Sequence, residues 1–598
     1  MARRPRACPR VFALALGLLA TAPAFADPLP ERSPRLVEYR IDVTLDPGSR
    51  VLQGQQRVSW RNPSTDQVGE LWFHLYLNAF RNSESTFMRE TRASGGIRGT
   101  EMADGGWGGL DVTSMRLADG ADLAPRLVFE APDDGNAEDR TLARVPLPAP
   151  VPPGGTITLD IAFTARLPRV LARTGYAGDF YFVGQWFPKL AVYEPAGRRG
   201  RAAGGWNAHQ FHATTEFYAD FGRYEVAIRL PSRFVVGATG QRTATTPHGD
   251  GTTTHTFVQE DVHDFAWTAD PRYIEQVHHF SAERDVTPQE YAEAAALLGR
   301  PLDEVKLRDV EIRLLIQPIH LPQASKYVES AKAAIKWFGL WYGRYPYATL
   351  TVVDPAPEGR NAGGMEYPTL ITGGTSFLLN RWPLWGVRAV EEVTVHEFGH
   401  QFWYGLVASN EFEEAWLDEG INSYSTAEVM DRAYGADRSV IDVPGVRIGS
   451  QVMARLQNSP RYTFARVRQP AWSYPEGYGF HSYTKPELLL RTLEAYLGEQ
   501  TMARVMRTYH ERWRFGHPGS DDFYAVANEV SGQDLTWFFR QAVEGTEVLD
   551  YEVSSVRVQR PPAREGWFDG PEGERLVTPP AAQRRRGRIA APSRFKGG

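Results

Sequence analysis

The sequence predicts an α+β multidomain protein in which an N-terminal antiparallel β saddle or sandwich is followed by a mainly helical domain. Three observations predict this class. The chain has 598 residues, 42% of them hydrophobic and 23% charged, which leaves room for more than one core. Apolar residues alternate in its first half and recur at helical spacing in its second. We expect a β-sheet domain over residues 27–278 and a helical domain over residues 279–547.

The first 26 residues form a predicted signal peptide. Arginines precede the apolar run from Val11 to Ala20, and the small residues Ala24 and Ala26 allow cleavage before Asp27. We therefore expect secretion across the inner membrane, into the periplasm. The alternative is a retained membrane anchor, for which the apolar run is short, and we expect no stable membrane span in the mature chain.

Charge and cysteine content narrow the possible chemistry. The predicted signal peptide holds four arginines and no acidic residue, so its removal changes the formal charge from −6 to −10. Such an acidic chain is not expected to bind nucleic acid. The single cysteine, Cys8, lies in the removed segment. Disulfides and cysteine chemistry are therefore excluded, and metal ligands must be histidine or carboxylate.

Alternation of apolar and polar residues marks the strands of the first domain. The stretches 37–45, 157–163 and 224–230 each place an apolar residue at every second position. Clusters of glycine, proline and aspartate between such stretches predict tight turns. Strands with one apolar face pack as an antiparallel sandwich or saddle of sheets.

Helical spacing replaces this alternation in the second domain. From Ala324 to Trp341, apolar residues recur three and four positions apart, which is typical of one face of a helix. A Gly-rich and Pro-rich loop over residues 354–367 follows a short predicted strand. Further predicted helices cover about residues 384–406, 416–433, 483–497, 502–515 and 520–530.

Two histidines and two glutamates in this domain have the spacing of a metal site. His396 and His400 are four residues apart, so on a helix both imidazoles project from one face. The 18 residues between His400 and Glu419 are enough to finish a helix and begin another. Two imidazoles and one carboxylate leave a tetrahedral zinc ion one open position, as in catalytic sites. Glu397 is placed to act as a general base on a water activated there.

The alternative interpretation of this segment is an ordinary amphipathic helix whose histidines pack or face water. The sequence WLDEG, from Trp416 to Gly420, argues against it, because two independent motifs rarely coincide at the right distance by chance. We therefore expect one zinc ion (Zn2+) per chain, held by His396, His400 and Glu419. Cobalt or manganese could occupy the same ligands.

Four motifs in order and spacing resemble the zinc aminopeptidases of peptidase family M1, the gluzincins that include aminopeptidase N. They are Gly363-Gly364-Met365-Glu366, HEFGH from His396, WLDEG from Trp416, and the pair Tyr478 and Tyr483. The stretch from Leu71 to Asn78 is similar to the family's saddle-shaped first domain. The resemblance extends from about residue 36 to 550 and implies a thermolysin-like catalytic domain with a peptide substrate.

The resemblance implies that the glycine-rich loop binds the substrate. In the family, the residues matching Gly363, Gly364 and Met365 lie along the peptide, and the glutamate matching Glu366 binds its free α-amine. That contact gives aminopeptidase rather than endopeptidase action. This sequence departs from the family at Tyr367, where asparagine is usual.

The resemblance also assigns a role to Tyr483. It falls where the family keeps a tyrosine whose hydroxyl donates a hydrogen bond to the oxyanion. The family tends to follow that tyrosine with Glu-Lys-Gly, whereas here Thr484 to Pro486 reads Thr-Lys-Pro. Tyr478 is a weaker candidate for the same role.

Four further polar residues stand out in the sequence. His209 and His212 lie in a strand-like region and are expected to be solvated rather than metal-bound. Gln185 is a candidate for lining the substrate cleft, by loose resemblance. Glu428 is a candidate for orienting a metal ligand, because carboxylates commonly hold metal-bound imidazoles in place, or is equally a surface acid.

Residues 548–598 are expected to form a short β remnant and a disordered basic tail. A strand-like stretch over residues 549–558 gives way to proline-rich and glycine-rich sequence. The basic run at residues 584–588 follows.

The whole sequence predicts a secreted zinc metallopeptidase that removes N-terminal residues from peptides. Glu397 would deprotonate the attacking water, Tyr483 would stabilise the oxyanion and Glu366 would anchor the amino terminus. One alternative is a zinc endopeptidase of thermolysin type, which cleavage of an N-terminally blocked peptide would favour. The other is a non-catalytic peptide-binding protein of the same fold. It would be expected to lose a ligand or Glu397, and neither is lost.

Overall fold

The computed structural model describes residues 32–96, 100–102, 104–374, 376–458, 464–474, 477–547, 555–557 and 564–578. The chain divides into two compact units, Met1–Glu547 and Val548–Gly598. The predicted signal peptide and the basic run at 584–588 lie outside the described residues. Within the described ranges, no helix is long and apolar enough to cross a membrane.

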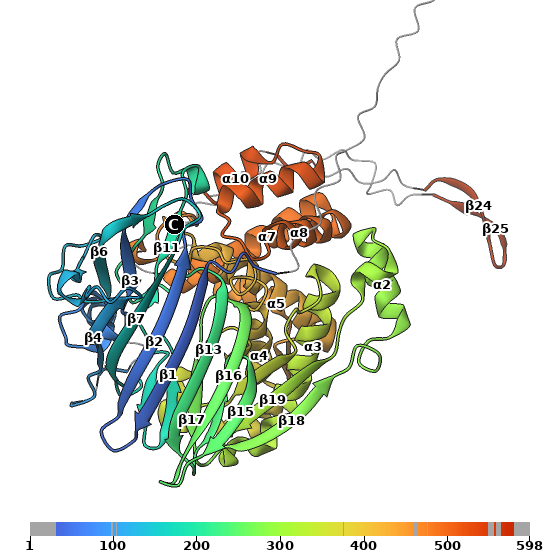
Figure 1. The fold of residues 1–598 in the computed structure, drawn as a ribbon. Coiled ribbons are helices and arrows are strands. Elements are labelled where there is room, and N and C mark those ends of the chain that lie inside the picture. Colours follow the sequence, from blue (N-terminus) through green and yellow to red (C-terminus); the bar gives the residue numbers. More distant parts are fainter. Residues whose placement is uncertain are drawn as a thin grey trace, which may run out of the picture. The chain divides into compact units, whose positions relative to one another are not determined.

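A seven-stranded sheet dominates the first half of the chain (Figure 1). Its strands lie side by side in the order β15-β16-β13-β1-β2-β7-β4. All neighbours are antiparallel except β1 and β13, which run parallel. The strands are β1 (Val37–Asp46), β2 (Val51–Arg61), β4 (Gly109–Leu117), β7 (Thr156–Arg166), β13 (Gly222–Pro231), β15 (Gln241–Pro247) and β16 (Thr252–Val262).

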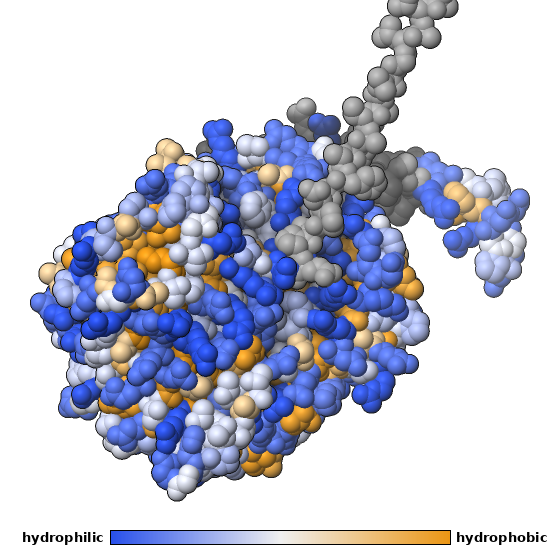
Figure 2. All heavy atoms as spheres, viewed as in Figure 1, coloured by the Kyte–Doolittle hydropathy of each residue, from blue (hydrophilic) through white to orange (hydrophobic). Residues whose placement is uncertain are grey.

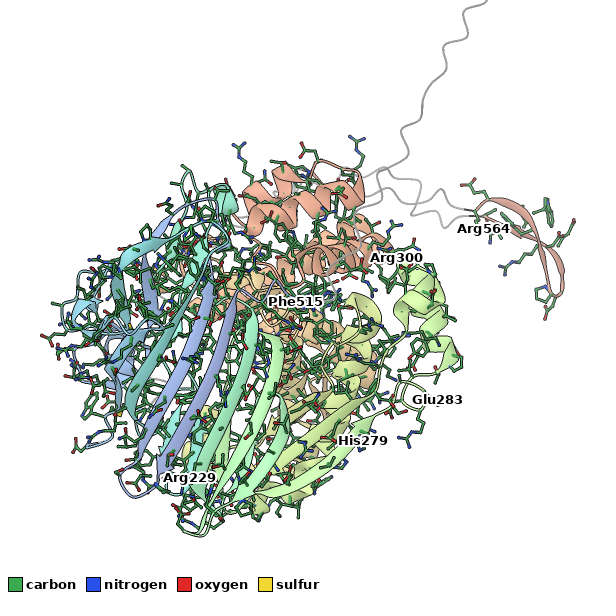
Figure 3. The ribbon with its side chains drawn as sticks, in the orientation of Figure 1. Arg229, His279, Glu283, Arg300, Phe515 and Arg564 are labelled. Atoms are coloured by element: carbon green, nitrogen blue, oxygen red, sulfur yellow. The ribbon has the colours of Figure 1, made fainter. Side chains whose placement is uncertain are left out.

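The apolar residues of these strands line the buried face of the sheet. Along β1, buried and exposed residues alternate strictly, and Tyr39 and Ile41 are at most 1% exposed. The face of the molecule in Figure 2 is mostly hydrophilic, with scattered apolar patches. Outward side chains such as Arg229 on β13 are labelled in Figure 3. The alternation therefore gives the sheet one core face and one outer face.

Shorter sheets pack against this buried face and complete the β-rich part. One has the order β10-β3-β6-β5 and another β14-β17-β9-β8, while β11 pairs with β12. Their strands are β3 (Val68–His74), β5 (Val128–Phe129), β6 (Leu142–Val151), β8 (Gly175–Ala177), β9 (Phe180–Val183), β10 (Lys189–Leu190), β11 (Val192–Glu194), β12 (Gly205–Asn207), β14 (Val235–Ala238) and β17 (Trp267–Asp270). The β-rich part also contains helix α1 (Thr86–Ala93).

A smaller sheet and a group of helices form the second half of the first unit. The sheet has the order β18-β19-β20-β21, in which only β18 and β19 are antiparallel. The predicted fold class, a β-rich part followed by a helical part, is confirmed. The elements are β18 (Ile274–Phe280), β19 (Val310–Ile316), β20 (Thr349–Val353), β21 (Leu370–Thr372), β22 (Ile441–Val443), β23 (Val446–Ile448), α2 (Pro288–Leu298), α3 (Ala324–Tyr342), α4 (Ala389–Gly399), α5 (Glu419–Tyr434), α6 (Ser450–Gln457), α7 (Lys485–Leu497), α8 (Glu499–Trp513), α9 (Ser520–Ser531) and α10 (Thr536–Ala542).

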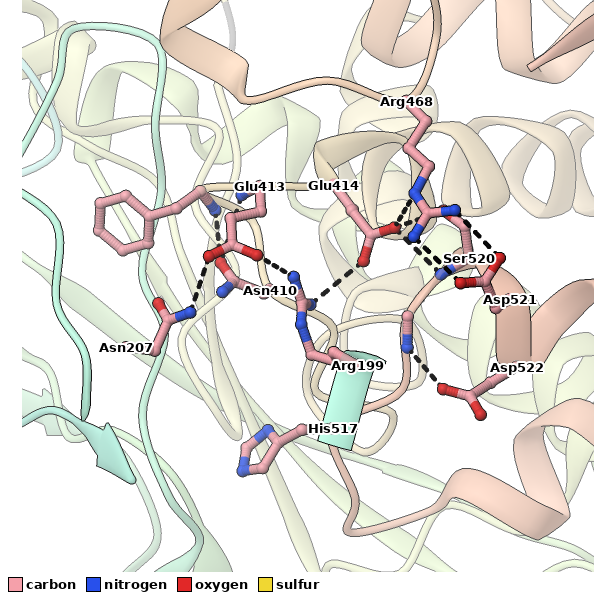
Figure 4. A network of polar contacts seen from close by, with 12 residues as sticks. Arg199, Asn207, Asn410, Glu413, Glu414, Arg468, His517, Ser520, Asp521 and Asp522 are labelled. Atoms are coloured by element: carbon pink, nitrogen blue, oxygen red, sulfur yellow. Dashed lines mark hydrogen bonds and ion pairs between the residues drawn. The ribbon is translucent and has the colours of Figure 1, made fainter. Parts of the chain in front are cut away.

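A polar network holds the loop that joins α4 to α5 (Figure 4). The guanidinium of Arg199, from the β-rich part, contacts the carboxylates of Glu413 and Glu414. Glu414 also accepts a 2.6 Å hydrogen bond from the Ser520 hydroxyl and pairs with Arg468 at 2.8 Å. The Arg199 side chain is only 7% exposed, so salt screens these charges weakly. The network therefore fixes the chain just before α5 begins.

The second unit contains a two-stranded antiparallel hairpin that the sequence pattern did not predict. It consists of β24 (Gly566–Gly570) and β25 (Gly573–Val577). The predicted β remnant at 549–558 lies almost entirely outside the described residues.

Candidate active site

His396, His400 and Glu419 converge on one point. His396 lies in the last turn of α4, His400 directly follows its last residue, and Glu419 begins α5. The Nε2 atoms of the two histidines are 3.1 Å apart, and each lies 3.2 Å from Oε2 of Glu419. The structure thus brings the three predicted ligands together from two helices.

Gly399 allows α5 to approach α4 closely enough for this. A Cβ atom at Gly399 would lie 1.9 Å from Oδ1 of Asn422 and 2.5 Å from the ring of Phe338. Nδ2 of Asn422 donates a 2.8 Å hydrogen bond to the backbone carbonyl of His396. A side chain at Gly399 would push the helices apart and move Glu419 away from the histidines.

The helix that carries the histidines is shorter than the predicted range of 384–406. It ends at Gly399, and the chain turns back so that the amide of Gly405 donates a 2.7 Å hydrogen bond to the carbonyl of His400. Phe402 and Leu406, beyond the turn, are fully buried. Because these two residues are apolar, the sequence pattern extends the predicted helix past the true end of α4.

The three ligand atoms fit a zinc ion. A tetrahedral zinc with bonds of about 2.0 to 2.1 Å keeps its ligand atoms roughly 3.3 Å apart. The separations of 3.1 and 3.2 Å here are close to that value. Two imidazole nitrogens and one carboxylate are also the donor set of catalytic rather than structural zinc sites. Within the described part of the chain, His396, His400 and Glu419 form one of the groups that could hold a metal ion.

Glu397 and Glu366 lie beside this point. Both side chains are nearly buried, and their carboxylates and a ring nitrogen of His400 lie within 4.8 Å of one another. Burial raises the pKa of Glu366 well above its ordinary value, and the neighbouring carboxylates of Glu216 and Glu397 raise it further. Ionisation of Glu366 is therefore unfavourable without a counter-ion, and a cationic ligand would stabilise the ionised carboxylate.

The glycine-rich loop is held by β21. The amide of Gly364 donates to the carbonyl of Thr372 at 2.9 Å, and the amide of Thr372 donates to the carbonyl of Met365 at 2.8 Å. Gly364 has a φ of 73°, which a residue with a side chain adopts only with strain. A Cβ atom at Gly363 would lie 2.4 Å from the carbonyl oxygen of Gly373. Both glycines are therefore needed to place Glu366.

Tyr367, where the family usually has asparagine, points away from the site. Its side chain is 3% exposed and packs against Phe182 and Phe217, with ring centroids 5.7 and 6.3 Å away. A Cβ atom at Gly184 would lie 2.1 Å from the Tyr367 hydroxyl, so that glycine makes room for the ring. The departure at Tyr367 changes the core beneath the loop and leaves Glu366 facing the site.

Tyr483 lies beside the ligand cluster. It belongs to a π-helical turn, Phe480–Thr484, directly before α7, so the predicted helix start at 483 is two residues early. Its hydroxyl donates a hydrogen bond to Oε1 of Glu419, and its ring stacks on His396 with centroids 5.8 Å apart. Burial raises the pKa of Tyr483 well above its ordinary value, as does Glu419. The hydroxyl therefore stays protonated and can donate.

A cavity of about 570 Å³ joins these groups. It is lined by all of the predicted site residues, which are Gly363, Gly364, Met365, Glu366, His396, Glu397, His400, Glu419 and Tyr483. Its remaining walls include Arg173 and Glu216 from the β-rich part. The cavity lies between the two parts of the first unit, where a peptide could reach the ligand cluster.

Residues 327–541 match the model of the Peptidase family M1 domain. This chain therefore carries a peptidase family M1 domain. Aminopeptidase 2 of Candida albicans is 28% identical over 228 residues, which make up 36% of this chain and 23% of that protein. Aminopeptidase N of Caulobacter vibrioides is 25% identical over 239 residues, 39% of this chain and 27% of that protein. The chain spans about a quarter of the length of the curated relatives it matches.

The likeness of fold extends beyond the M1 domain. The crystal structure of the M1 zinc metallopeptidase from Deinococcus radiodurans aligns with a TM-score of 0.55 at 16% identity. The alignment covers 88% of this chain and 98% of that one. The order of a β-rich part and a helical part is therefore common to both proteins.

Sequence reasoning missed two residues that support the M1 site directly. Asp418 accepts a hydrogen bond from Nδ1 of His400 at 2.5 Å. Glu411 is buried nearby, and burial raises its pKa well above the ordinary value, as does the adjacent Asp418. Asp418 could have been found from its place beside Glu419 in WLDEG. Glu411 lies in an acidic loop whose pattern gives no such indication.

Arg173 and Glu216 were also missed. They form a buried ion pair in the wall of the cavity, and the backbone amide of Arg173 bonds to the carbonyl of Asn361 at 3.0 Å. Burial raises the pKa of Glu216 despite Arg173. They come from the β-rich part, far from the M1 motifs in sequence, so spacing could not connect them to the site.

Three expectations about other polar residues were wrong. His209 and His212 are not solvated, because both contact the Asp133 carboxylate and His212 is 1% exposed. Gln185 does not line the cavity; its side chain is buried and accepts a 2.7 Å hydrogen bond from Lys189. Glu428 orients no metal ligand and instead pairs with Arg491 at 3.0 Å.

Proposed function

We propose that this protein is a zinc metallopeptidase that removes N-terminal residues from peptides. The observation that carries the proposal is the place of Glu366, whose carboxylate lies within 4.8 Å of Glu397 and His400. A buried carboxylate at that distance from the general base would hold an ammonium group about one residue from the reacting bond. The relatives named aminopeptidases support the same activity.

Each residue of the site has a part in this reaction. When bound by His396, His400 and Glu419, zinc supplies Lewis acidity toward the carbonyl and lowers the pKa of water. Glu397 accepts the proton of the attacking water and passes it to the leaving amine. The Tyr483 hydroxyl donates a hydrogen bond to the oxyanion.

The binding groups orient the peptide for this reaction. Glu366 accepts hydrogen bonds from the α-ammonium, and the ordered backbone of Gly363 and Gly364 lies along the peptide. Since Glu366 is fixed by the loop pairing with β21, the amino terminus is held before the reaction begins. One zinc ion per chain is part of the proposal.

Export to the periplasm is a further part of the proposal. It is supported by the arginines and the apolar run of residues 1–26, which lie outside the described residues. Fractionation of cells that express the full chain would test it: mature protein in the periplasm, starting at Asp27, is the expected result. Full-length protein in the membrane fraction would contradict it.

The test of the activity compares one peptide with a free and with an acetylated amino terminus, using zinc-loaded protein. Sequential loss of N-terminal residues from the free peptide alone is expected, followed by mass spectrometry. In Glu366→Gln, kcat/KM for the free peptide should fall roughly 10-fold to 100-fold, because a charge-assisted hydrogen bond is lost. Internal cleavage of both peptides would instead support the endopeptidase. Absence of any cleavage with zinc bound would overturn the proposal.

A further inference from the structure

A second cavity, of about 250 Å³, adjoins the first at the ligand cluster. Both cavities are lined by Val393, His396, Glu397 and Tyr483. The glycine-rich loop and Glu366 line only the first cavity. The second cavity therefore continues on the side of Glu397 that faces away from Glu366.

This direction fixes which part of a peptide would enter the cavity, given the proposed function. If the amino terminus is held at Glu366, the first residue occupies the first cavity and the reacting bond lies beside Glu397. The residue after that bond then lies beyond Glu397. Its side chain faces the second cavity.

Besides Glu397, the lining of the second cavity combines apolar walls and uncharged polar side chains with two further carboxylates. The carboxylates are Glu392, one turn before His396 on α4, and Glu487 in the first turn of α7. No lysine or arginine is among the described residues that line it. The apolar walls are formed by Val393, Ala427, Met430, Val440, Met453 and Ala454.

The negative charge in this cavity is poorly neutralised. Among the described residues, no ion pair involves Glu392. Glu487 pairs with Nε of Arg491 at 3.1 Å, but the same guanidinium lies 3.0 Å from Glu428 and 3.9 Å from Asp431. The Arg491 guanidinium is therefore shared by the carboxylates of Glu487, Glu428 and Asp431.

The pKa values agree with this charge balance. Burial raises the pKa of Glu487 to about 7, and the nearby charge of Glu392 contributes in the same direction. Burial also raises the pKa of Glu392. A cation entering the cavity would relieve both carboxylates.

We propose that this cavity selects peptides whose second residue is lysine or arginine. The long aliphatic stem of such a side chain would pack against the apolar walls, and its charged end would meet Glu392 and Glu487. An uncharged side chain of the same length would pack against the apolar walls but would form no ion pair with Glu392 or Glu487. An acidic side chain would be repelled.

The test uses the peptides Ala-Lys-Ala, Ala-norleucine-Ala and Ala-Glu-Ala with the zinc-loaded protein, following release of the first alanine. The lysine peptide should have a kcat/KM about tenfold above that of the norleucine peptide, as expected for one hydrogen bond between charged groups. In Glu392→Gln and in Glu487→Gln this ratio should fall toward one. Glu499→Gln is the control, because it removes an exposed carboxylate that does not line the cavity and, among the described residues, forms no ion pair with Arg491; the ratio should remain unchanged.

Failure of this inference and failure of the proposed function give different results. Equal cleavage of the lysine and norleucine peptides, or an unchanged ratio in Glu392→Gln and Glu487→Gln, would overturn the selectivity alone. If no peptide is cleaved, the selectivity is tested by peptide binding instead. Calorimetry with zinc-loaded Glu397→Gln protein measures the affinity for each peptide. About tenfold tighter binding of the lysine peptide, lost when Glu392→Gln is added, would support the cavity. Equal binding would overturn it.

Discussion

Nδ1 of His400 donates a 2.5 Å hydrogen bond to Oδ1 of Asp418, and both side chains are 1% exposed. A carboxylate can only accept, so Nδ1 carries the proton and the lone pair of Nε2 faces His396 and Glu419. The contact therefore selects the tautomer that a ligand histidine needs. Since Asp418 directly precedes Glu419, one short segment supplies both a ligand and the group that orients another.

Replacing Asp418 with asparagine should weaken zinc binding roughly 10-fold to 100-fold. The asparagine amide can donate to Nδ1, which favours the tautomer with its proton on Nε2. Competition with a chelator of known affinity would measure the change. Asp431→Asn is the control, because Asp431 lies on α5, the helix that Asp418 precedes, but accepts from the Ser450 hydroxyl at 2.7 Å, away from the ligands. Equal zinc affinity in Asp418→Asn and wild type would contradict the orienting role.

The convergence of the three predicted metal ligands could be anticipated from the sequence because they are close together in it. His396 and His400 are one helical turn apart, and Glu419 follows within a spacing that a second helix can close. The role of the glycine-rich loop was proposed only through family resemblance. Its position depends on backbone hydrogen bonds to Thr372, which no local pattern indicates.

What the sequence could not predict depends on contacts between distant segments. Arg173 and Glu216 reach the cavity from the β-rich part, and their pairing is visible only after folding. His209 and His212 were expected to be solvated, because an i,i+3 pair on a strand gives no indication of a covering surface. In the structure, Trp472 from the helical part stacks on His212 with ring centroids 4.6 Å apart. Strand alternation, by contrast, predicted the burial of β1 correctly, since it depends only on local geometry.

Glu397→Gln and His400→Ala should separate catalysis from metal binding. Glutamine keeps the size of Glu397 but cannot accept the proton of water, so kcat should fall roughly 100-fold to 10,000-fold with zinc still bound. His400→Ala removes a ligand, and both zinc and hydrolysis should be lost. Metal analysis of the purified variants and peptide hydrolysis check both statements. Near-normal turnover in Glu397→Gln would rule out its role as general base.

Tyr483→Phe should lower kcat while leaving zinc content unchanged. The substitution removes one hydrogen-bond donor to the oxyanion, and losses of this kind reduce kcat roughly 100-fold to 1,000-fold. Tyr478→Phe is the control, because Tyr478 lines the same cavity and its ring lies 6.1 Å from that of Tyr483. Its effect should be much smaller. If the two variants were equally impaired, Tyr483 would have no special role.

The histidines His209 and His212 should make the stability of the protein depend on pH. Burial opposes their protonation, but hydrogen bonds to Asp133, and to Glu413 or Glu90, outweigh it and raise the pKa of each to about 9. A raised pKa stabilises the folded state fully below the ordinary value of about 6.5. That stabilisation is lost as the pH rises through about 9. The thermal midpoint should therefore fall as the pH rises from about 6.5 to about 9 and change little from this cause at higher pH.

Replacing Asp133 with asparagine should expose the origin of this pH dependence. The variant loses the carboxylate that both histidines contact, so it should be less stable than wild type near neutral pH, on the order of a few kcal/mol. Because wild type itself loses this contribution as the pH rises from about 6.5 to about 9, the difference in thermal midpoint should shrink over that range. His279→Gln, which alters an exposed histidine on β18 (Figure 3), should show no such trend. A difference between Asp133→Asn and wild type that stays constant from neutral to alkaline pH would mean that the histidines are not protonated in the folded protein.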